Sequence, residues 1–254
     1  MCAEIYRHED KYIINRMQAE ILKQRARAVM RPDAHTRPDG LYSVRSLYFD
    51  DINNSCYRES GDGTDPRAKF RIRIYNEDKN YIRLEKKIKK RGLCRKLSAM
   101  ISEEECRMLM AGRIPKFTGD EGQGSAKAGA GDAGYQERLS AEAVKRQLFS
   151  ELEAKNLRPV VIISYDRLPF IYPFLNIRFT IDTGLFYSEN TDSFLEKETR
   201  FGIPAMREND DYGIMELKWD DMVPLHLKDY LSIETLIHSR FSKYYYCRSD
   251  QRGI

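Results

Sequence analysis

Four basic side chains recur at every second position of residues 67–75, whose sequence is RAKFRIRIY. They are Arg67, Lys69, Arg71 and Arg73, and apolar residues occupy the positions between them. A repeat of two residues is the period of a β-strand, so one face of this strand is cationic and the other is apolar. Such a cationic face contacts either bulk water or something negatively charged.

The same alternation recurs in other segments of the chain. Residues 80–90, 176–183 and 212–220 each place charged side chains on one parity and bulky apolar side chains on the other. Lys86 breaks the apolar side of the first of these segments. An antiparallel sheet with one solvated face would explain any single strand of this kind. Recurrence in several strands favours a closed barrel, with apolar residues facing outward under helices and charges facing a wet interior.

A charged interior predicts the kind of ligand that the barrel would hold. Burying many like charges is costly unless water and a counter-ion fill the space. A polyanion meets this need, because arginine offers forked donors to phosphate oxygens and lysine offers a point charge. Interior carboxylates would either hold a divalent metal ion that bridges phosphates or pair with cations that the ligand leaves unused.

The elements that would position these side chains are strands in groups, separated by a few helices. Asn15 with Gln18 and Ser102 with Glu105 resemble capping boxes, so helices are predicted over 16–30 and up to residue 112. The remaining expected helices are 140–156, 223–231 and 240–246. The expected strands are 4–14, 41–51, 68–75, 80–90, 92–101, 158–170, 176–185 and 212–221. Residues 53–67 are expected to be a turn-rich loop. This order predicts an α+β fold with an antiparallel sheet or barrel.

Two of the helices are expected to cover the apolar faces of the strands. Their predicted apolar residues are Met17, Ile21, Ala28 and Val29 in the first helix, and Val144, Leu148 and Leu152 in the helix that Ser140 would cap. Residues 118–134 are rich in Gly, Ala and Ser, which predicts a flexible surface insertion. The pattern does not change after it, so residues 1–254 are expected to form one domain.

Composition limits the classes of protein that fit. The chain has 254 residues, of which 41% are hydrophobic and 32% are charged, and its net charge is only +4. Strong positive potential must therefore come from local arrangement, and the interleaved acidic residues weigh against a nucleic-acid binder. No segment has the length of a membrane span. Five scattered cysteines without a CxxC pair predict a reduced, cytoplasmic protein without a zinc site.

Eight segments together carry a resemblance to a known family. They are RHEDKYII, SLYFDD, KFRIRIY, IRLEKKIKK, SYDRLPF, NIRFTID, MELKWD and RFSKYYY, in this order along the chain. The sequence resembles the VTC-type polyphosphate polymerase domain of the triphosphate tunnel (CYTH-like) superfamily. The resemblance implies an eight-stranded antiparallel β tunnel with a basic interior and flanking helices. It also implies transfer of the γ-phosphate of ATP to a growing inorganic polyphosphate chain, with Mn²⁺ or Mg²⁺ as cofactor.

The resemblance also implies roles for individual residues. The residues implied to clamp the triphosphate and stabilise the transferred phosphate are Arg71, Arg73, Lys87, Arg178 and Lys243. The residues implied to bind substrate are Lys11, Lys96, Tyr165, Arg167, Lys218, Arg240 and Ser242, with Arg95 an equally placed alternative to Lys96. Glu216 is implied to bind the metal ion. Glu85 and Asp182 are secondary metal candidates, and salt bridges to tunnel cations explain them at least as well.

Three alternatives to the polymerase stay open at this stage. A triphosphatase of the same superfamily is the nearest, although its E-x-E-x-K signature is met only by Glu9 and Lys11. A non-catalytic polyphosphate-binding module is the second, and a nucleic-acid binder with an open basic sheet is the third. All of the phosphate-binding alternatives require the charged faces to converge on one enclosed channel.

Overall fold

The computed structural model describes residues 6–34, 36–116, 132–202 and 211–251. The strands are β1 (His8–Asn15), β2 (Arg31–Pro32), β3 (Tyr42–Asp50), β4 (Arg67–Tyr75), β5 (Ile82–Lys90), β6 (Leu93–Ile101), β7 (Arg158–Tyr172), β8 (Ile177–Ser188), β9 (Asp211–Trp219) and β10 (Ile237–His238). The helices are α1 (Arg16–Val29), α2 (Ser55–Gly61), α3 (Glu103–Met110), α4 (Asp132–Ala154), α5 (Leu225–Tyr230) and α6 (Lys243–Gln251), and a 3₁₀ turn covers Thr191–Ser193.

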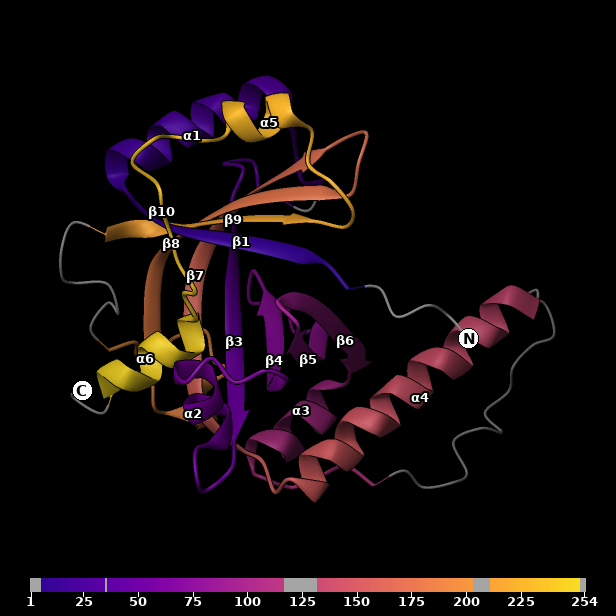
Figure 1. The fold of residues 1–254 in the computed structure, drawn as a ribbon. Helices are drawn as coiled ribbons and strands as arrows, with labels where there is room; N and C mark the ends of the chain where they lie inside the picture. The colour runs from indigo at the N-terminus through magenta and orange to yellow at the C-terminus, as the bar shows by residue number, and fades with distance from the viewer. Residues whose placement is uncertain (1–5, 35, 117–131, 203–210, 252–254) are drawn as a thin grey trace.

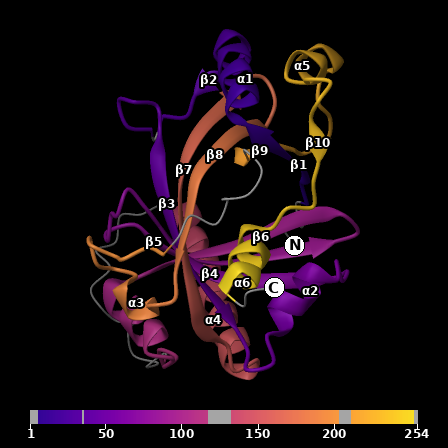
Figure 2. The ribbon, with the colours of Figure 1, turned by 90° about the vertical axis from the view of Figure 1, so that its left-hand side faces the viewer.

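All strands belong to one antiparallel sheet that curls into a tunnel (Figures 1 and 2). The strand order is β10-β1-β9-β8-β7-β3-β4-β5-β6, and β2 pairs with β7. The ring closes where Arg7, just before β1, exchanges two backbone hydrogen bonds of 2.8 Å with Cys94 in β6. The eight longer strands make up this ring, which confirms the predicted tunnel. The sheet counts ten strands because the two-residue strands β2 and β10 also pair with β7 and β1.

The apolar faces of the strands point out of the tunnel, and helices cover them in two places. Helices α3 and α4 cover β3 to β6, where Phe70, Ile72 and Leu84 belong to one buried cluster. Helices α1 and α5 cover the other side, where Phe179 and Leu217 belong to a second buried cluster. The opposite parity of each strand therefore faces the interior, as the inside-out barrel predicted.

Lys86, which breaks the alternation of β5, lies on this outer face. Its ammonium pairs with the Glu151 carboxylate of α4, and it lies 5.5 Å from the centre of the Phe70 ring. A charged residue among apolar ones is accommodated here because the covering helix supplies a partner. Val144, Leu148 and Leu152 of α4 pack on the same cluster, as their spacing predicted.

Both predicted capping boxes are present, at Asn15 with Gln18 and at Ser102 with Glu105. The predicted apolar side of α1 is wrong, however. Its buried residues are Ala19, Leu22 and Ala26, whereas its exposed apolar residues are Met17, Ile21, Ala28 and Val29. The small alanines let the helix lie close against the sheet, so size at the contact decided the buried side rather than hydrophobicity alone.

Other boundaries also differ from the predictions. The expected loop 53–67 contains α2, whose first backbone N–H groups donate to the carboxylates of Asp51 and Asp50. Helix α4 begins at Asp132, so Ser140 is not its cap. Of the expected insertion 118–134, residues 132–134 belong to α4 and the rest lie outside the described residues. None of the helices in the described segments is both long and apolar enough to span a bilayer.

A third buried cluster lies inside the curl of the sheet. Tyr48 and Ile163 from the strands pack there against Tyr244 and Cys247 of α6, and Tyr57 of α2 joins them. Tyr244 stacks on Tyr48 with ring centres 5.0 Å apart. Helix α6 therefore fills part of the interior and brings its first residue, Lys243, among the charged side chains of the strands.

Candidate functional site

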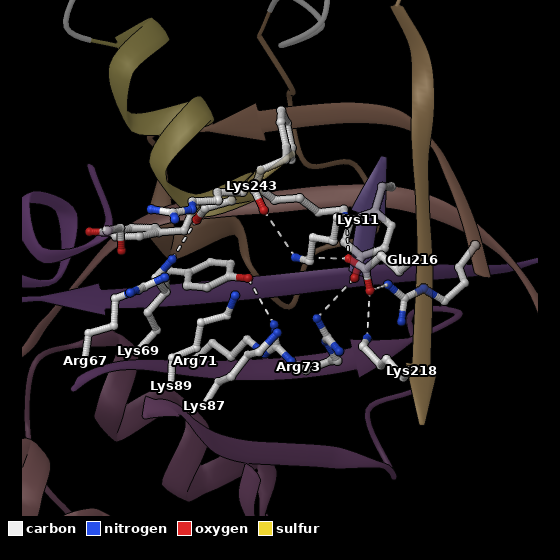
Figure 3. A pocket seen from close by; sticks show the side chains of 18 residues that line it. Lys11, Arg67, Lys69, Arg71, Arg73, Lys87, Lys89, Glu216, Lys218 and Lys243 are labelled. Atoms are coloured by element: carbon white, nitrogen blue, oxygen red, sulfur yellow. Dashed lines mark hydrogen bonds and ion pairs between the residues drawn. The ribbon is translucent and has the colours of Figure 1, made fainter. Parts of the chain in front are cut away.

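The inward faces of the strands and the start of α6 form one pocket, here called the tunnel pocket (Figure 3). It encloses about 830 Å³ of empty space, part of it open to solvent. Among the described residues, eleven of its lining side chains are Lys or Arg, and Glu216 is the one lining carboxylate. The cations are Lys11, Arg67, Lys69, Arg71, Arg73, Lys87, Lys89, Arg167, Lys218, Arg240 and Lys243.

One part of the tunnel pocket is organised around the buried Glu216 carboxylate. Four cations contact it: Lys218 at 2.7 Å, Lys243 at 3.1 Å, Lys11 at 3.3 Å and Arg167 at 3.4 Å. Burial alone would raise the pKa of Glu216, but the surrounding lysines outweigh it and hold this pKa well below its usual value. We call these five residues the Glu216 group; in Figure 3 Lys11, Glu216 and Lys218 lie on the right.

Asp182 supports this group from below the pocket surface. Both of its oxygens accept hydrogen bonds from the Arg167 guanidinium at 2.6 Å, and Lys243 lies 2.6 Å from one of them. Despite the cost of burial, the charges of Arg167 and Lys243 lower the pKa of Asp182. Arg167 and Lys243 are thus each held between two carboxylates and keep fixed positions.

A second buried carboxylate, Glu85, orients the paired arginines of β4. Arg71 donates to it at 2.7 and 2.9 Å, and Lys96 lies 3.0 Å away. Arg73 is 3.9 Å from the same carboxylate, and it donates to the Tyr165 hydroxyl at 3.1 Å. Arg71 and Arg73 alternate along one strand, so both guanidinium groups reach the same wall of the tunnel pocket.

The sequence did not single out Glu9 as a site residue, yet its buried side chain belongs to the interior. Lys87 donates to both of its oxygens at 2.7 Å, and Lys218 lies 3.3 Å away. Burial is overcome by Lys11, Lys87 and Lys218, so the pKa of Glu9 is well below its usual value. The signal that could have found it is parity, because Glu9 and Lys11 share the inward face of β1.

Another part of the tunnel pocket contains cations with no carboxylate partner among the described residues. Lys69 donates to the Ser242 hydroxyl at 2.6 Å, and Arg67 donates to the Thr64 carbonyl at 2.6 Å. Arg240 lines the same region. We call Arg67, Lys69, Arg240 and Ser242 the Lys69 group. Arg67 and Lys69 lie on the left of Figure 3, away from Glu216.

Lys69 titrates unusually because of this arrangement. Burial, followed by the positive charges of Lys11, Lys87, Arg67 and Lys89, lowers the pKa of Lys69 well below its usual value. Lys69 belongs to the alternating pattern of residues 67–75, but no motif in the sequence marked it as a site residue. Its distinctive feature, the lack of a counter-charge, depends on residues far away in the chain.

Most of the residues predicted from the sequence do meet in the tunnel pocket. Those that line it are Lys11, Arg71, Arg73, Lys87, Tyr165, Arg167, Glu216, Lys218, Arg240, Ser242 and Lys243. Lys96 pairs in register with Lys87 on the inward face, whereas Arg95 pairs with Ile88 on the outer one. Of the two, Lys96 therefore has the inward parity and contacts Glu85, but its side chain is about half exposed and does not line the tunnel pocket.

Arg178 is a predicted site residue that lies outside this arrangement. It is on the inward parity of β8, but its guanidinium donates to Asp33 at 2.9 Å and to the Tyr42 hydroxyl at 2.7 Å. It does not line the tunnel pocket. Its assignment to the phosphate clamp stays a prediction.

A family model for the VTC domain matches residues 6–249. The chain belongs to the VTC domain family. The match spans all the strands and helices named above up to the last turn of α6. No curated protein matches the chain.

Solved structures with a similar arrangement are distant from this VTC domain in sequence. A putative adenylate cyclase from Bacillus halodurans is 14% identical, with a TM-score of 0.42 over 88% of this chain and 86% of that chain. The PH1819 protein from Pyrococcus horikoshii is 11% identical, with a TM-score of 0.45 over 97% of this chain and 100% of that chain. Because these identities and TM-scores are low, the two structures support no inference about the function of this VTC domain.

Proposed function

We propose that this VTC domain is a metal-dependent polyphosphate polymerase that transfers the γ-phosphate of ATP to a growing polyphosphate chain. The observation that carries the proposal is the excess of positive charge in the tunnel pocket. Among the described residues, eleven lining cations share only four buried carboxylates, which are Glu9, Glu85, Asp182 and Glu216. A wet cavity of this kind requires a ligand with several negative charges, and a phosphate chain supplies them at regular intervals.

Arg71, Arg73, Lys87 and Lys243 would contact the phosphates during transfer. Phosphoryl transfer depends on placing the reactants in line and neutralising charge, and it needs no protein nucleophile. The carboxylates Glu85, Glu9, Asp182 and Glu216 fix these cations before substrate arrives, so little reorganisation remains when the charge develops. The terminal phosphate of the acceptor chain would attack the γ-phosphate, and ADP would leave.

The residues of the pocket fit a divalent ion only in part. The described residues contain no cluster of three or more His, Cys, Asp or Glu side chains that could hold a metal by itself. Glu216 offers one carboxylate at the pocket surface, and Mg²⁺ and Mn²⁺ sites commonly combine one or two carboxylates with substrate phosphates. Glu216 would therefore be the protein ligand of an ion that also binds the phosphates. Glu85 and Asp182 form salt bridges with interior cations instead, which is the alternative to metal binding that the sequence left open for them.

A triphosphatase is the second candidate, and the position of Glu9 favours it. Glu9 and Glu216 both face the interior and share contacts with Lys11 and Lys218. Two carboxylates near one phosphate-binding surface could orient a water molecule or hold a metal ion for hydrolysis. Glu9 and Lys11, the only part of the E-x-E-x-K signature that the sequence contains, therefore both face the tunnel interior.

One assay separates these candidates. The purified protein is incubated with ATP and Mn²⁺, and both chain length and free phosphate are measured. We expect polyphosphate chains to grow. Release of phosphate without chains would replace the polymerase by the hydrolase, and the absence of both products with retained polyphosphate binding would leave a binding module.

A further inference from the structure

The Asp50 carboxylate lies at the end of β3, is fully buried, and joins three elements of the fold. One of its oxygens accepts the Cys56 backbone N–H at 2.9 Å, and the other accepts that of Tyr57 at 3.1 Å. The second oxygen also accepts a hydrogen bond from the Tyr244 hydroxyl. A single buried carboxylate therefore ties the last residue of β3 to the first turns of α2 and α6.

Tyr244 directly follows Lys243, the first residue of α6. The Lys243 ammonium is buried at 2.6 Å from an Asp182 oxygen and 3.1 Å from a Glu216 oxygen. The N-terminal end of a helix carries partial positive charge, so the helix itself repels a lysine at this position. The two carboxylates hold the ammonium, but the backbone of the first turn needs an anchor of its own if Lys243 is to reach both of them.

Helix α2 also packs along the side of α6 (Figures 1 and 2). The Tyr57 ring stacks on Tyr245 with ring centres 4.9 Å apart, and the Tyr57 hydroxyl lies 3.1 Å from the Ser249 hydroxyl. A Cβ atom at Gly61 would approach the Tyr245 ring to 2.5 Å, so a glycine is needed for this close packing. These contacts would keep α6 docked if the bond between Tyr244 and Asp50 were lost.

The sequence assigned no role to Asp50 or Tyr244, although both belong to segments that carry the family resemblance, SLYFDD and RFSKYYY. They lie 194 positions apart in the chain. We propose that Asp50 is a positioning residue that acts through the Tyr244 hydroxyl and holds the first turn of α6 where Lys243 meets the Glu216 group. Asp50 itself does not line the tunnel pocket. The effect on turnover rests on the proposed function, whereas the placement of Lys243 does not.

The alternative is that Asp50 stabilises α2 alone. Its bonds to the N–H groups of Cys56 and Tyr57 satisfy donors that have no partner within the helix, whatever α6 does. Asp50→Ala would remove these bonds together with the bond to Tyr244, so it does not separate the two roles. Removing the Tyr244 hydroxyl does, because both bonds to α2 remain.

Tyr244→Phe tests the placement of Lys243 without any ligand. The variant loses the hydroxyl but keeps the ring, which stacks on Tyr48 with ring centres 5.0 Å apart. The measurement is the rate at which an acetylating reagent modifies Lys243, followed by mass spectrometry. We expect this rate to rise about tenfold, because the first turn of α6 opens more often once its bond to a charged group is lost.

Lys86 is the internal control, because it is a lysine of similar burial outside the tunnel. Its side chain is 14% exposed, against 7% for Lys243, and it pairs with Glu151 on the outer face of the sheet. Its rate should change less than about twofold in Tyr244→Phe. Equal increases at both lysines would show a general loosening of the fold, and an unchanged rate at Lys243 would show that Asp50 does not hold it. Either result would overturn the inference.

Tyr245→Phe is the matched control variant. It removes a hydroxyl from the next residue of the same helix and keeps the ring that stacks on Tyr57. Lys243 should be acetylated in this variant as slowly as in the wild-type chain. Faster acetylation of Lys243 in both variants would mean that any change at this end of α6 releases the lysine, which contradicts a specific role of Asp50.

Turnover of ATP supplies the second readout. We expect kcat to fall about tenfold in Tyr244→Phe while KM for ATP changes less than about threefold. The other cations of the tunnel pocket still bind the phosphates, whereas transfer requires Lys243 in its place. A rise in KM with unchanged kcat would contradict a role in placing the group that contacts the transferred phosphate.

The inference and the proposed function can fail separately. If the wild-type chain makes no polymer but Tyr244→Phe exposes Lys243 selectively, the positioning role of Asp50 stands and the polymerase is wrong. If the wild-type chain makes polymer and acetylation of Lys243 is the same in Tyr244→Phe, the polymerase stands and the positioning role is wrong.

Discussion

The Glu216 group and the Lys69 group lie in the same pocket but handle positive charge differently. Around Glu216, carboxylates neutralise the cations and fix their positions, and the pKa of Lys243 is raised by Asp182 and Glu216 despite its burial. Around Lys69, cations face other cations and the pKa of Lys69 falls. The comparison teaches that a basic tunnel need not be uniform. In one part buried carboxylates hold the cations in place, and in the other the described residues supply no carboxylate.

The largest effect on the free energy of unfolding should appear when a buried carboxylate is removed. Glu85 is fully buried and contacts Arg71 and Lys96, so Glu85→Gln leaves the desolvated Arg71 guanidinium without a carboxylate, and among the described residues only the Tyr48 hydroxyl still accepts from it. We expect a loss of about 3–5 kcal/mol in the free energy of unfolding, measured by urea denaturation.

The matched control for this change is Glu20→Gln, at an exposed carboxylate on α1 that lies 3.5 Å from Lys23. Exposed pairs contribute little, so its effect should be below about 1 kcal/mol. Equal effects of the two substitutions would mean that the interior carboxylates do not hold the cations in place.

Glu216→Gln tests the role of the Glu216 group in turnover. The variant keeps the shape of the side chain but loses the charge that would hold a divalent ion and position Lys11, Lys218 and Lys243. We expect metal-dependent consumption of ATP to fall by about 10²–10³-fold, with the circular dichroism spectrum of a folded protein. Unchanged turnover in a folded variant would remove Glu216 from the mechanism.

Acid should destabilise the folded protein by protonating the buried carboxylates of the tunnel interior. The pKa values of Glu9, Glu85, Asp182 and Glu216 are all lowered by neighbouring cations. Their contribution to stability is complete above the unfolded pKa values of about 4 and is lost as the pH falls toward the folded values. We expect the free energy of unfolding to drop by at least about 2 kcal/mol between pH 6 and pH 3. A flat profile would contradict the pairing of these carboxylates.

The smallest effect should come from removing Lys69. Folding lowers the pKa of Lys69, so the charged form destabilises the folded state. This cost is complete below the folded pKa, shrinks as the pH rises above it, and is gone at the unfolded pKa. Lys69→Gln should therefore be slightly more stable than the wild-type chain at pH 6, by less than about 1 kcal/mol. A loss of several kcal/mol would show that Lys69 is a structural residue.

Much of the fold followed from short-range patterns in the sequence. The alternation in 67–75 placed Phe70 and Ile72 on one face and Arg71 and Arg73 on the other, and the structure agrees. The two capping boxes were also predicted correctly, because the bonds of a cap join residues three apart. Helix α2 was missed, since its first backbone N–H groups donate to the carboxylates of Asp50 and Asp51, which lie outside the helix.

The site was predicted less completely, because its contacts join residues far apart in the chain. Glu9 was passed over as a site residue, although it pairs with Lys87 of β5 and Lys218 of β9. Arg178 has the right parity, but Asp33 and Tyr42 engage it away from the pocket. Alternation along a strand determines which face of the sheet a residue lies on. Its partner depends on which strand lies across the tunnel and on the register of that strand.

The sequence by itself determined which side chains share a face, because the pleat of a strand forces neighbours to opposite sides. Only the tertiary structure decided that the charged face is the inner one and how its charge is divided. The seam at Arg7 and Cys94 closes the ring, and Ser242 reaches Lys69 across 173 positions of the chain. Such long-range placements depend on the packing of the whole chain, so no local pattern could reveal that Lys69 lacks a counter-charge.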